Sequence, residues 1–233
     1  MNALQDKLYS TFILDDRYIF FVNGLKNTLV ITIFAALLGI LLGFLIAIVR
    51  TTHDRQGAKK NIIINILDVI ARVYLTVIRG TPTTVQLLIM YYIIMSGSTN
   101  KVLIAIMTFG INSGAYVAEI VRSGIQSIDR GQFEAGRSLG FNYSQTMWYI
   151  IIPQAFKNVL PALANEFITL LKETSISGYI ALNDLTRAGD IIRSLTYETF
   201  FPLLTVAAIY LIIVMILTWL VGKLERRLHT GDR

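Results

Sequence analysis

The sequence has no cysteine and little charge. Among its 233 residues cysteine is absent, which excludes disulfide bonds and thiolate metal sites. Charged residues make up 15% of the chain and hydrophobic residues 54%, whereas soluble domains carry roughly 25% charged residues. The apolar residues gather into long runs. This composition is typical of a membrane protein with several spans.

The sequence also lacks the patterns of an enzyme. No G-x-x-x-x-G-K-[ST] phosphate loop is present, so any nucleotide site must lie on another chain. No nucleophile–base arrangement and no metal-ligand cluster emerges. The two histidines, His53 and His229, fall in basic segments and are expected to be solvated. We therefore predict no catalytic residue, no metal site and no cofactor on this chain.

The apolar runs predict an all-α, polytopic helical membrane protein that forms one transmembrane domain over residues 1–233. A hydrocarbon core of about 30 Å needs about 20 helical residues. Five transmembrane helices are expected, at about residues 22–50, 80–97, 101–122, 160–181 and 198–222. The first contains a G-x-x-x-G pair, Gly39 and Gly43, which is typical of close helix approach but also arises by chance.

The segment 61–78 is apolar but interrupted by Asn65, Asp68 and Arg72. These three residues fall on one face of a helix, so we predict an amphipathic helix at the membrane surface that leads into the second span.

The distribution of Lys and Arg predicts the orientation of the chain. The loops expected on one side, 50–60, 122–158 and 223–233, carry twelve Lys and Arg, and the loops on the other side carry five. Cytoplasmic loops are enriched in these residues. The net charge of +6 is thus explained by topology, with the N-terminus outside and the C-terminus in the cytoplasm.

The polar segment 129–153 predicts a helical elbow on the cytoplasmic side. Asp129 is expected to cap a first short helix over residues 132–139. Gly140 fits the left-handed residue that follows a helix. The segment is long and well ordered for a simple connection, so we interpret it as a socket for a soluble partner.

A second short helix is expected to follow Gly140. Either Asn142 or Ser144 caps it, and Pro153 ends or redirects it. Apolar side chains are expected to hold the elbow together: Phe133, Leu139, Phe141, Met147 and Trp148.

Residues 134–153, EAGRSLGFNYSQTMWYIIIP, resemble the EAA loop of ABC-importer permeases. Gly136 replaces the third small residue of that pattern and Ile152 replaces its leucine. The matching positions are Glu134, Ala135, Gly140, Ile150 and Pro153.

Four further segments extend the resemblance across most of residues 79–190. They are RGTPTTVQ at 79–86, YVAEIVR at 116–122, PAL at 161–163 and LLKETS at 170–175. These segments look like those of the polar amino acid branch, which comprises histidine, glutamine and arginine permeases.

The resemblance implies a permease subunit in a bacterial inner membrane that works as a dimer, with itself or with a homologous second permease. An ABC ATPase subunit, which holds ATP-Mg, docks on the EAA loop, and an extracytoplasmic binding protein delivers the amino acid. The residues expected to couple to the ATPase are Glu134, Ala135, Gly136, Arg137 and Gly140.

Polar groups inside spans usually face a cavity or a partner. The candidates for solute contact are Thr81, Gln86, Asn112, Ser113, Tyr116, Glu119 and Glu166. Two carboxylates in one cavity would favour a basic amino acid. Glu119 and Arg122 are three residues apart and equally fit a simple ion pair, and Glu166 equally fits a gate or a subunit interface.

Three alternatives stay open. The chain fits an ABC permease for another small solute, such as methionine or an opine. A secondary transporter is less favoured, because five spans with one elbow do not divide into two inverted repeats. A membrane-embedded enzyme is disfavoured because the carboxylates are isolated from one another.

Overall fold

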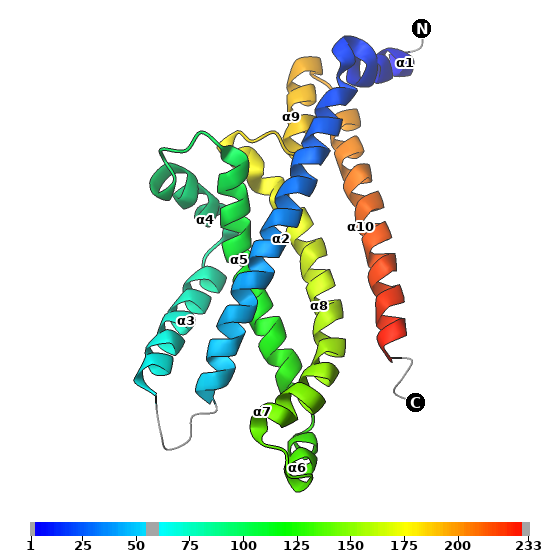
Figure 1. Ribbon diagram of the computed structural model, residues 1–233. Helices are drawn as coiled ribbons and strands as arrows, with labels where there is room; N and C mark the ends of the chain where they lie inside the picture. The colour runs from blue at the N-terminus through cyan, green and yellow to red at the C-terminus, as the bar shows by residue number, and fades with distance from the viewer. Residues whose placement is uncertain (1–2, 55–60, 230–233) are drawn as a thin grey trace. The chain divides into compact units, whose positions relative to one another are not determined.

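The computed structural model describes residues 3–54 and 61–229, which contain helices and no strand. Parts of the basic segments 50–60 and 223–233 lie outside these ranges. The α-helices are α1 (Ala3–Leu8), α2 (Tyr18–Asp54), α3 (Ile62–Gly80), α4 (Thr83–Ile89), α5 (Lys101–Gln126), α6 (Arg130–Ser138), α7 (Tyr143–Thr146), α8 (Ile152–Glu173), α9 (Leu185–Thr196) and α10 (Phe200–His229). The predicted all-α class is confirmed (Figure 1).

Shorter helical turns of two kinds join these helices. Three are π-helical: η1 (Tyr9–Ile13), η3 (Met90–Ile94) and η4 (Met147–Ile151). Two are 3₁₀ helices: η2 (Leu14–Asp16) and η5 (Thr174–Ile180).

Three helices in the described part of the chain are long and apolar enough to cross a membrane, namely α2, α5 and α10. The predicted second span corresponds to the shorter helix α4 with η3, and the predicted fourth span to α8 with η5. The number of five spans stays a prediction.

The helix that contains the start of the predicted fourth span begins before that span. Pro161 lies inside α8, and the helix begins at Ile152. Proline removes one backbone donor and commonly breaks soluble helices. It is tolerated within membrane helices, where neighbouring groups satisfy the freed carbonyl. The bounds of the fourth span itself stay a prediction.

The chain divides into two compact units. Unit 1 comprises Met1–Leu38, Thr81–Ile111 and Ile168–Leu217, and unit 2 comprises Gly39–Gly80, Asn112–Phe167 and Thr218–Arg233. The prediction of a single transmembrane domain stays a prediction.

Unit 1 is built around two apolar clusters. The first joins α2, α4, α5, the end of α8 and η5 through nine buried residues, and the second joins α2, α9 and α10. Close approach of α2 to the start of α9 depends on Gly24, because a Cβ there would lie 2.7 Å from the carbonyl oxygen of Asp184. The absence of a side chain at Gly24 thus allows the start of α9 to lie this close to α2.

Unit 2 packs the second part of α2 against α5. A Cβ at Gly39 would lie 2.9 Å from the Cβ of Ser113, and a Cβ at Gly43 would overlap Val117. The G-x-x-x-G pair therefore allows close helix approach within this chain. Ala47, Val117, Val121 and Val159 form the buried cluster beside it.

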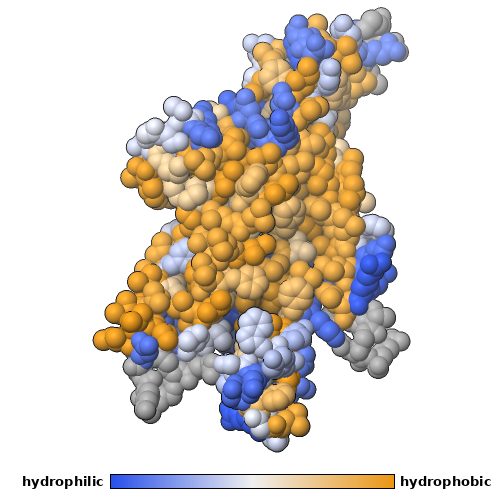
Figure 2. Space-filling model, viewed as in Figure 1, coloured by the Kyte–Doolittle hydropathy of each residue, from blue (hydrophilic) through white to orange (hydrophobic). Residues whose placement is uncertain are grey.

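The predicted amphipathic helix exists as α3, and its polar face points into unit 2. Asp68 and Ala71 are its buried residues, whereas its isoleucine and valine side chains are mostly exposed. The surface of α3 in Figure 2 is accordingly mostly hydrophobic, while hydrophilic colours gather over α6 and α7. A location at the membrane surface stays a prediction.

Candidate functional site

The first helix of the elbow, α6, begins as the sequence indicates. The Asp129 side chain accepts a hydrogen bond from the Gly131 backbone N–H at 2.7 Å. A helix start leaves four backbone donors without partners, and this carboxylate satisfies one of them. The helix starts at Arg130, two residues before the predicted start.

The chain reverses at Gly140, which has a φ of +82°. The Phe141 N–H donates to the Gly136 carbonyl at 3.0 Å and the Gly140 N–H donates to the Arg137 carbonyl at 2.9 Å. These two bonds define the Schellman ending of a helix, in which glycine adopts the left-handed conformation at little cost. The predicted left-handed conformation of Gly140 after the first helix is confirmed.

Asn142, rather than Ser144, caps the second helix. Its side chain accepts from the Gln145 N–H at 3.0 Å, and the Gln145 side chain accepts from the Asn142 N–H at 2.8 Å. This reciprocal capping box fixes the start of α7. The turn between α6 and α7 is therefore ordered by two local signals, the reversal at Gly140 and the capping box of Asn142.

Small size at residue 136 lets α6 pack on α7. Gly136 is buried, and a Cβ there would lie 2.6 Å from the Thr146 Cγ2 atom. An alanine at this position would therefore require Thr146 to move. The structure places Gly136 inside the elbow, whereas Glu134, Ala135, Arg137 and Gly140 are exposed on it.

The predicted apolar contacts of the elbow are correct in part. Met147 is buried, Phe133 stacks on Tyr143 with ring centroids 6.3 Å apart, and Phe141 lies 6.2 Å from Tyr149. Two others were wrong: Leu139 is 71% exposed and Trp148 is 68% exposed. Both side chains point away from the elbow core because α6 ends before Leu139 and because η4 turns Trp148 outward.

Pro153 does not end the second helix. The π-helical turn η4 follows α7 directly and continues into α8, of which Pro153 is the second residue. The Ile152 N–H bonds to the Met147 carbonyl, five residues earlier. Such a local π adjustment accommodates a proline without breaking the helix. Of the two predicted alternatives, an end or a redirection of the helix at Pro153, the end was wrong.

The predicted solute residues of unit 2 form two adjacent groups on α5. In the first, Ser113 Oγ donates to Glu166 Oε1 on α8 at 2.8 Å. Asn112 and Ser113 are each 1% exposed, so this face of α5 is polar and closely packed. The structure thus brings Ser113 and Glu166 together, as a shared site requires.

The second group surrounds Glu119. Arg79 Nη1 and Arg122 Nη1 each lie 3.7 Å from a Glu119 carboxylate oxygen. The Arg79 guanidinium also lies over the Tyr116 ring, 5.9 Å from its centroid. The ion pair with Arg122 that the spacing allowed is present, and a second arginine joins it. Glu119 is therefore already balanced by cations within the chain.

Thr81 and Gln86 belong to unit 1. The Gln86 Nε2 atom donates to the Thr81 hydroxyl at 2.8 Å and to its carbonyl at 3.1 Å. These two predicted residues therefore contact each other at the start of α4. Their role in solute contact stays a prediction.

Sequence reasoning missed a charge cluster centred on Asp68. This buried carboxylate accepts from Arg50 Nη1 at 2.9 Å and from Arg72 Nε at 2.6 Å. His53 Nδ1 lies 3.5 Å from it, so the expectation that His53 is solvated was wrong. The polar face of residues 61–78 was the sequence signal that could have indicated this cluster. The partners of Asp68 on α2, however, depend on helix packing that the sequence does not reveal. His229 has no described side chain.

The Asp68 cluster continues toward Glu119. Arg122 Nε lies 3.6 Å from Asp54 Oδ2, and His53 Nδ1 lies 3.8 Å from Asp54 Oδ1. Ion pairs and the contacts of His53 therefore connect α2, α3 and α5 within unit 2. This arrangement can hold α5, which carries four predicted solute residues, in a fixed position against its neighbours.

Comparison with known proteins decides the family. Residues 62–230 match the family model described as binding-protein-dependent transport system inner membrane component. The chain belongs to this family. It is therefore an inner-membrane component of a binding-protein-dependent ABC importer, and the class predicted from the EAA-like loop is confirmed.

The relatives of this permease cover nearly its whole length. It is 36% identical to a putative glutamine transport system permease protein GlnP of Rickettsia typhi, over 91% of this chain and 94% of the relative. It is also 36% identical to the arginine transport system permease protein ArtQ of Bacillus subtilis, over the same shares. Glutamine and arginine are the solutes named for these two relatives.

Solved structures agree with the fold. A crystal structure of an amino acid ABC transporter with histidines matches with a TM-score of 0.82 and 42% identity, over 92% of this chain and 96% of that one. An inward-facing MetNI methionine ABC transporter matches with a TM-score of 0.75 at 20% identity, over 91% and 97%. The second likeness shows the fold alone.

Proposed function

We propose that this permease carries a polar amino acid across the inner membrane, driven by a separate ATPase that docks on the α6–α7 elbow. The observation that carries the proposal is the elbow itself. Its turn is fixed by the Gly140 reversal and the Asn142 capping box, while Glu134 and Arg137 remain exposed. A pre-ordered surface loses little entropy when a partner binds.

The other subunits of the transport complex are inferred from the family. An extracytoplasmic binding protein delivers the solute, and ATP-Mg is held by the partner ATPase. Two permease subunits form the membrane unit, either as a homodimer or as a homologous heterodimer. The bias of Lys and Arg supports an N-terminus outside and a cytoplasmic elbow and C-terminus. No cofactor is assigned to the permease chain.

The solute is inferred from the α5–α8 group. Ser113 and Glu166 supply a hydroxyl and a carboxylate side by side, and Asn112 lies next to Ser113. A carboxylate can bind the ammonium of an amino acid or a basic side chain. Because two arginines balance Glu119, a preference for a basic amino acid depends mainly on Glu166. The glutamine and arginine permeases among the relatives support a polar amino acid, whereas the likeness to the methionine transporter shows the fold alone.

ATPase coupling is tested by reconstituting the permease with its candidate ATPase and binding protein and measuring ATP hydrolysis stimulated by amino acids. Arg137→Glu reverses a charge on the exposed face of the elbow, and we expect stimulation to fall about tenfold. Lys223→Glu is the control, because it makes the same charge change on α10. Equal effects of the two variants would remove the elbow as the docking site.

Solute preference is tested by comparing uptake of arginine, lysine and glutamine. Glu166→Gln should lower uptake of the two basic amino acids relative to glutamine. Glu119→Gln should change this ratio less, because Glu119 already pairs with two arginines. An unchanged ratio in Glu166→Gln would exclude the basic preference but would leave the coupling proposal intact.

A further inference from the structure

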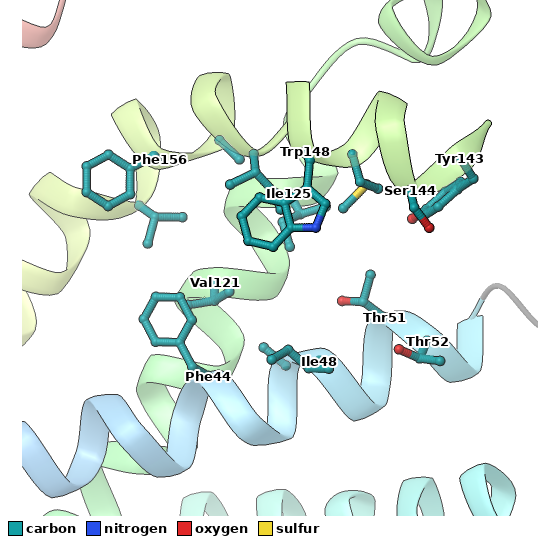
Figure 3. A pocket seen from close by; sticks show the side chains of 15 residues that line it. Phe44, Ile48, Thr51, Thr52, Val121, Ile125, Tyr143, Ser144, Trp148 and Phe156 are labelled. Atoms are coloured by element: carbon teal, nitrogen blue, oxygen red, sulfur yellow. The ribbon is translucent and has the colours of Figure 1, made fainter. Parts of the chain in front are cut away.

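Unit 2 contains a cavity of about 450 Å³ whose lining includes none of the predicted solute residues. Its walls come from the second part of α2, from α5 and from the continuous stretch α7–η4–α8 (Figure 3). The volume lies within the range of small-ligand pockets, roughly 300–1,000 Å³. One wall is the part of the elbow that follows its turn, α7 and η4 (residues 143–151), and includes Met147 and Trp148. We call this part the outgoing arm of the elbow.

Polarity changes along this cavity from one end to the other. Phe44 and Phe156 lie at one end in Figure 3, and Thr51, Thr52 and Ser144 lie at the opposite end. Between them, Figure 3 labels the aliphatic side chains of Ile48, Val121 and Ile125 and the indole of Trp148. An apolar cavity is poorly occupied by water, since water needs two to four polar partners. The gradient therefore fits a molecule with a hydrocarbon part and a polar part.

The hydroxyls at the polar end have no hydrogen-bond partner among the residues that the structure describes. Thr51, Thr52 and Ser144 make no side-chain hydrogen bond among residues 3–54 and 61–229. By contrast, Thr32 and Thr108 donate to the carbonyl four residues earlier in their helices. Three hydroxyls from two different chain segments thus converge at one end of the cavity with their donors available.

We propose that the cavity binds one acyl chain of a membrane phospholipid, with the glycerol-ester region and headgroup at the hydroxyls of Thr51, Thr52 and Ser144. Membership of an inner-membrane family places the chain in phospholipid. The hydroxyl end matches the polar part of this amphiphile and the phenylalanine end matches its hydrocarbon. A helix of a second copy is 10–12 Å across with its side chains, whereas an acyl chain is a single file of methylene groups.

Binding at this position would link the lipid to the elbow. The acyl chain would lie between Ile48 on α2 and Trp148 on η4. It would thus fill space that otherwise separates these two elements. Burial of apolar surface stabilises by about 25 cal/mol per Å². The lipid would therefore hold the outgoing arm of the elbow against α2.

The two tryptophans of the chain allow a direct test. In Trp219→Phe, fluorescence comes from Trp148 in the cavity wall. In Trp148→Phe, it comes from Trp219 on α10. The purified dimer is titrated in detergent with phosphatidylcholine carrying brominated acyl chains. We expect saturable quenching of Trp148 at a single lipid per chain, and quenching of Trp219 that rises only with the bulk lipid fraction.

Matched substitutions on α2 make the test specific. Ile48→Phe adds bulk inside the cavity and should abolish the saturable component, whereas Leu45→Phe, exposed on the same helix but outside the lining, should leave it unchanged. Thr51→Val keeps the shape but removes a hydroxyl, and should weaken binding several-fold. Identical quenching of the two tryptophans, or saturable quenching retained in Ile48→Phe, would overturn the proposal.

A second copy of the chain as occupant gives a different result. The natural chain has no cysteine, so Ser144→Cys provides a unique thiol. With lipid in the cavity, added phospholipid should protect this thiol from a maleimide reagent equally in monomer and dimer. Protection that depends on dimer formation and not on lipid would assign the cavity to the second copy and would overturn the lipid proposal.

Discussion

Asp184 in unit 1 and Asp68 in unit 2 are both almost completely buried, yet different groups compensate them. Asp68 accepts hydrogen bonds from two arginine side chains, Arg50 and Arg72. Asp184 accepts from the backbone N–H groups of Thr186 at 3.0 Å and Arg187 at 3.2 Å, at the start of α9. One carboxylate is held by full charges and the other by backbone dipoles.

At Asp184, the backbone donors offset the effect of burial on the pKa only in part. Burial raises the pKa of Asp184 to about 6 from its ordinary value of 3.8, although the hydrogen bonds from Thr186 and Arg187 act in the opposite direction. The backbone N–H groups that bind Asp184 belong to the first turn of α9, so the carboxylate caps this helix and fixes where it begins. Charged partners join separate helices, and Asp68 accordingly ties α3 to α2.

Removing the Asp68 carboxylate should have the largest effect. Asp68→Ala leaves the guanidinium of Arg50, which is largely buried, without its partner. Breaking a buried ion pair on one side typically costs about 3–5 kcal/mol. We expect the free energy of unfolding to fall by that order, measured by circular dichroism during denaturation in detergent. Restoring much of this loss in the double variant Asp68→Ala with Arg50→Met would confirm that the unpaired cation is responsible, and no restoration would refute it.

The pH dependence of Asp184 should be the next largest effect. Because its pKa is about 6 in the folded protein and lower when unfolded, the folded state binds more protons between about pH 4 and 6. Stability from this group is therefore present at low pH and is lost as the pH rises through 6. A shift of about two units corresponds to roughly 3 kcal/mol.

The control for this pH effect is Asp184→Asn, which keeps an oxygen for the cap but does not ionise in this range. The difference in midpoint between wild type and Asp184→Asn should change between pH 4 and 7, with the variant becoming relatively more stable as pH rises. A constant difference across the range would contradict the raised pKa.

The elbow was predictable from the sequence because its determinants are local. Asp129, Gly140 and Asn142 each act on backbone groups within about one helical turn, and all three roles were predicted, with Asn142 one of two candidates for its cap. The details that failed there, the exposure of Trp148 and the continuation through Pro153, both follow from the π turn η4. That turn has no local sequence signature that we could identify.

The charge cluster was not predictable for the opposite reason. The sequence revealed that Asp68 and Arg72 share a helix face, but Arg50 is eighteen residues away on another helix. Which cation meets Asp68 depends on how closely α2 and α3 pack. Pairings of this kind require the tertiary structure, as does the balance of Glu119 by Arg79.

Removing the cap of α9 should have a moderate effect that does not depend on pH. Asp184→Ala lacks any acceptor for the Thr186 and Arg187 N–H groups. Loss of an N-cap side chain costs about 1 kcal/mol. We therefore expect Asp184→Ala to be less stable than Asp184→Asn by that amount at both pH 4 and pH 7. Equal stability of the two variants would show that the side chain does not act as a cap.

The smallest effect is expected from the exposed partner of the Asp68 cluster. Arg72 donates to Asp68 at 2.6 Å, but its side chain is 56% exposed, so water screens the pair and can replace it. Exposed ion pairs contribute about 0.2–1 kcal/mol. Arg72→Ala should lower stability within that range, while Arg50→Ala, which removes the largely buried partner, should cost several times more. If the two arginines had equal effects, short distance rather than burial would determine the strength of these pairs, and the contrast between a charge-compensated Asp68 and a backbone-compensated Asp184 would lose its physical basis.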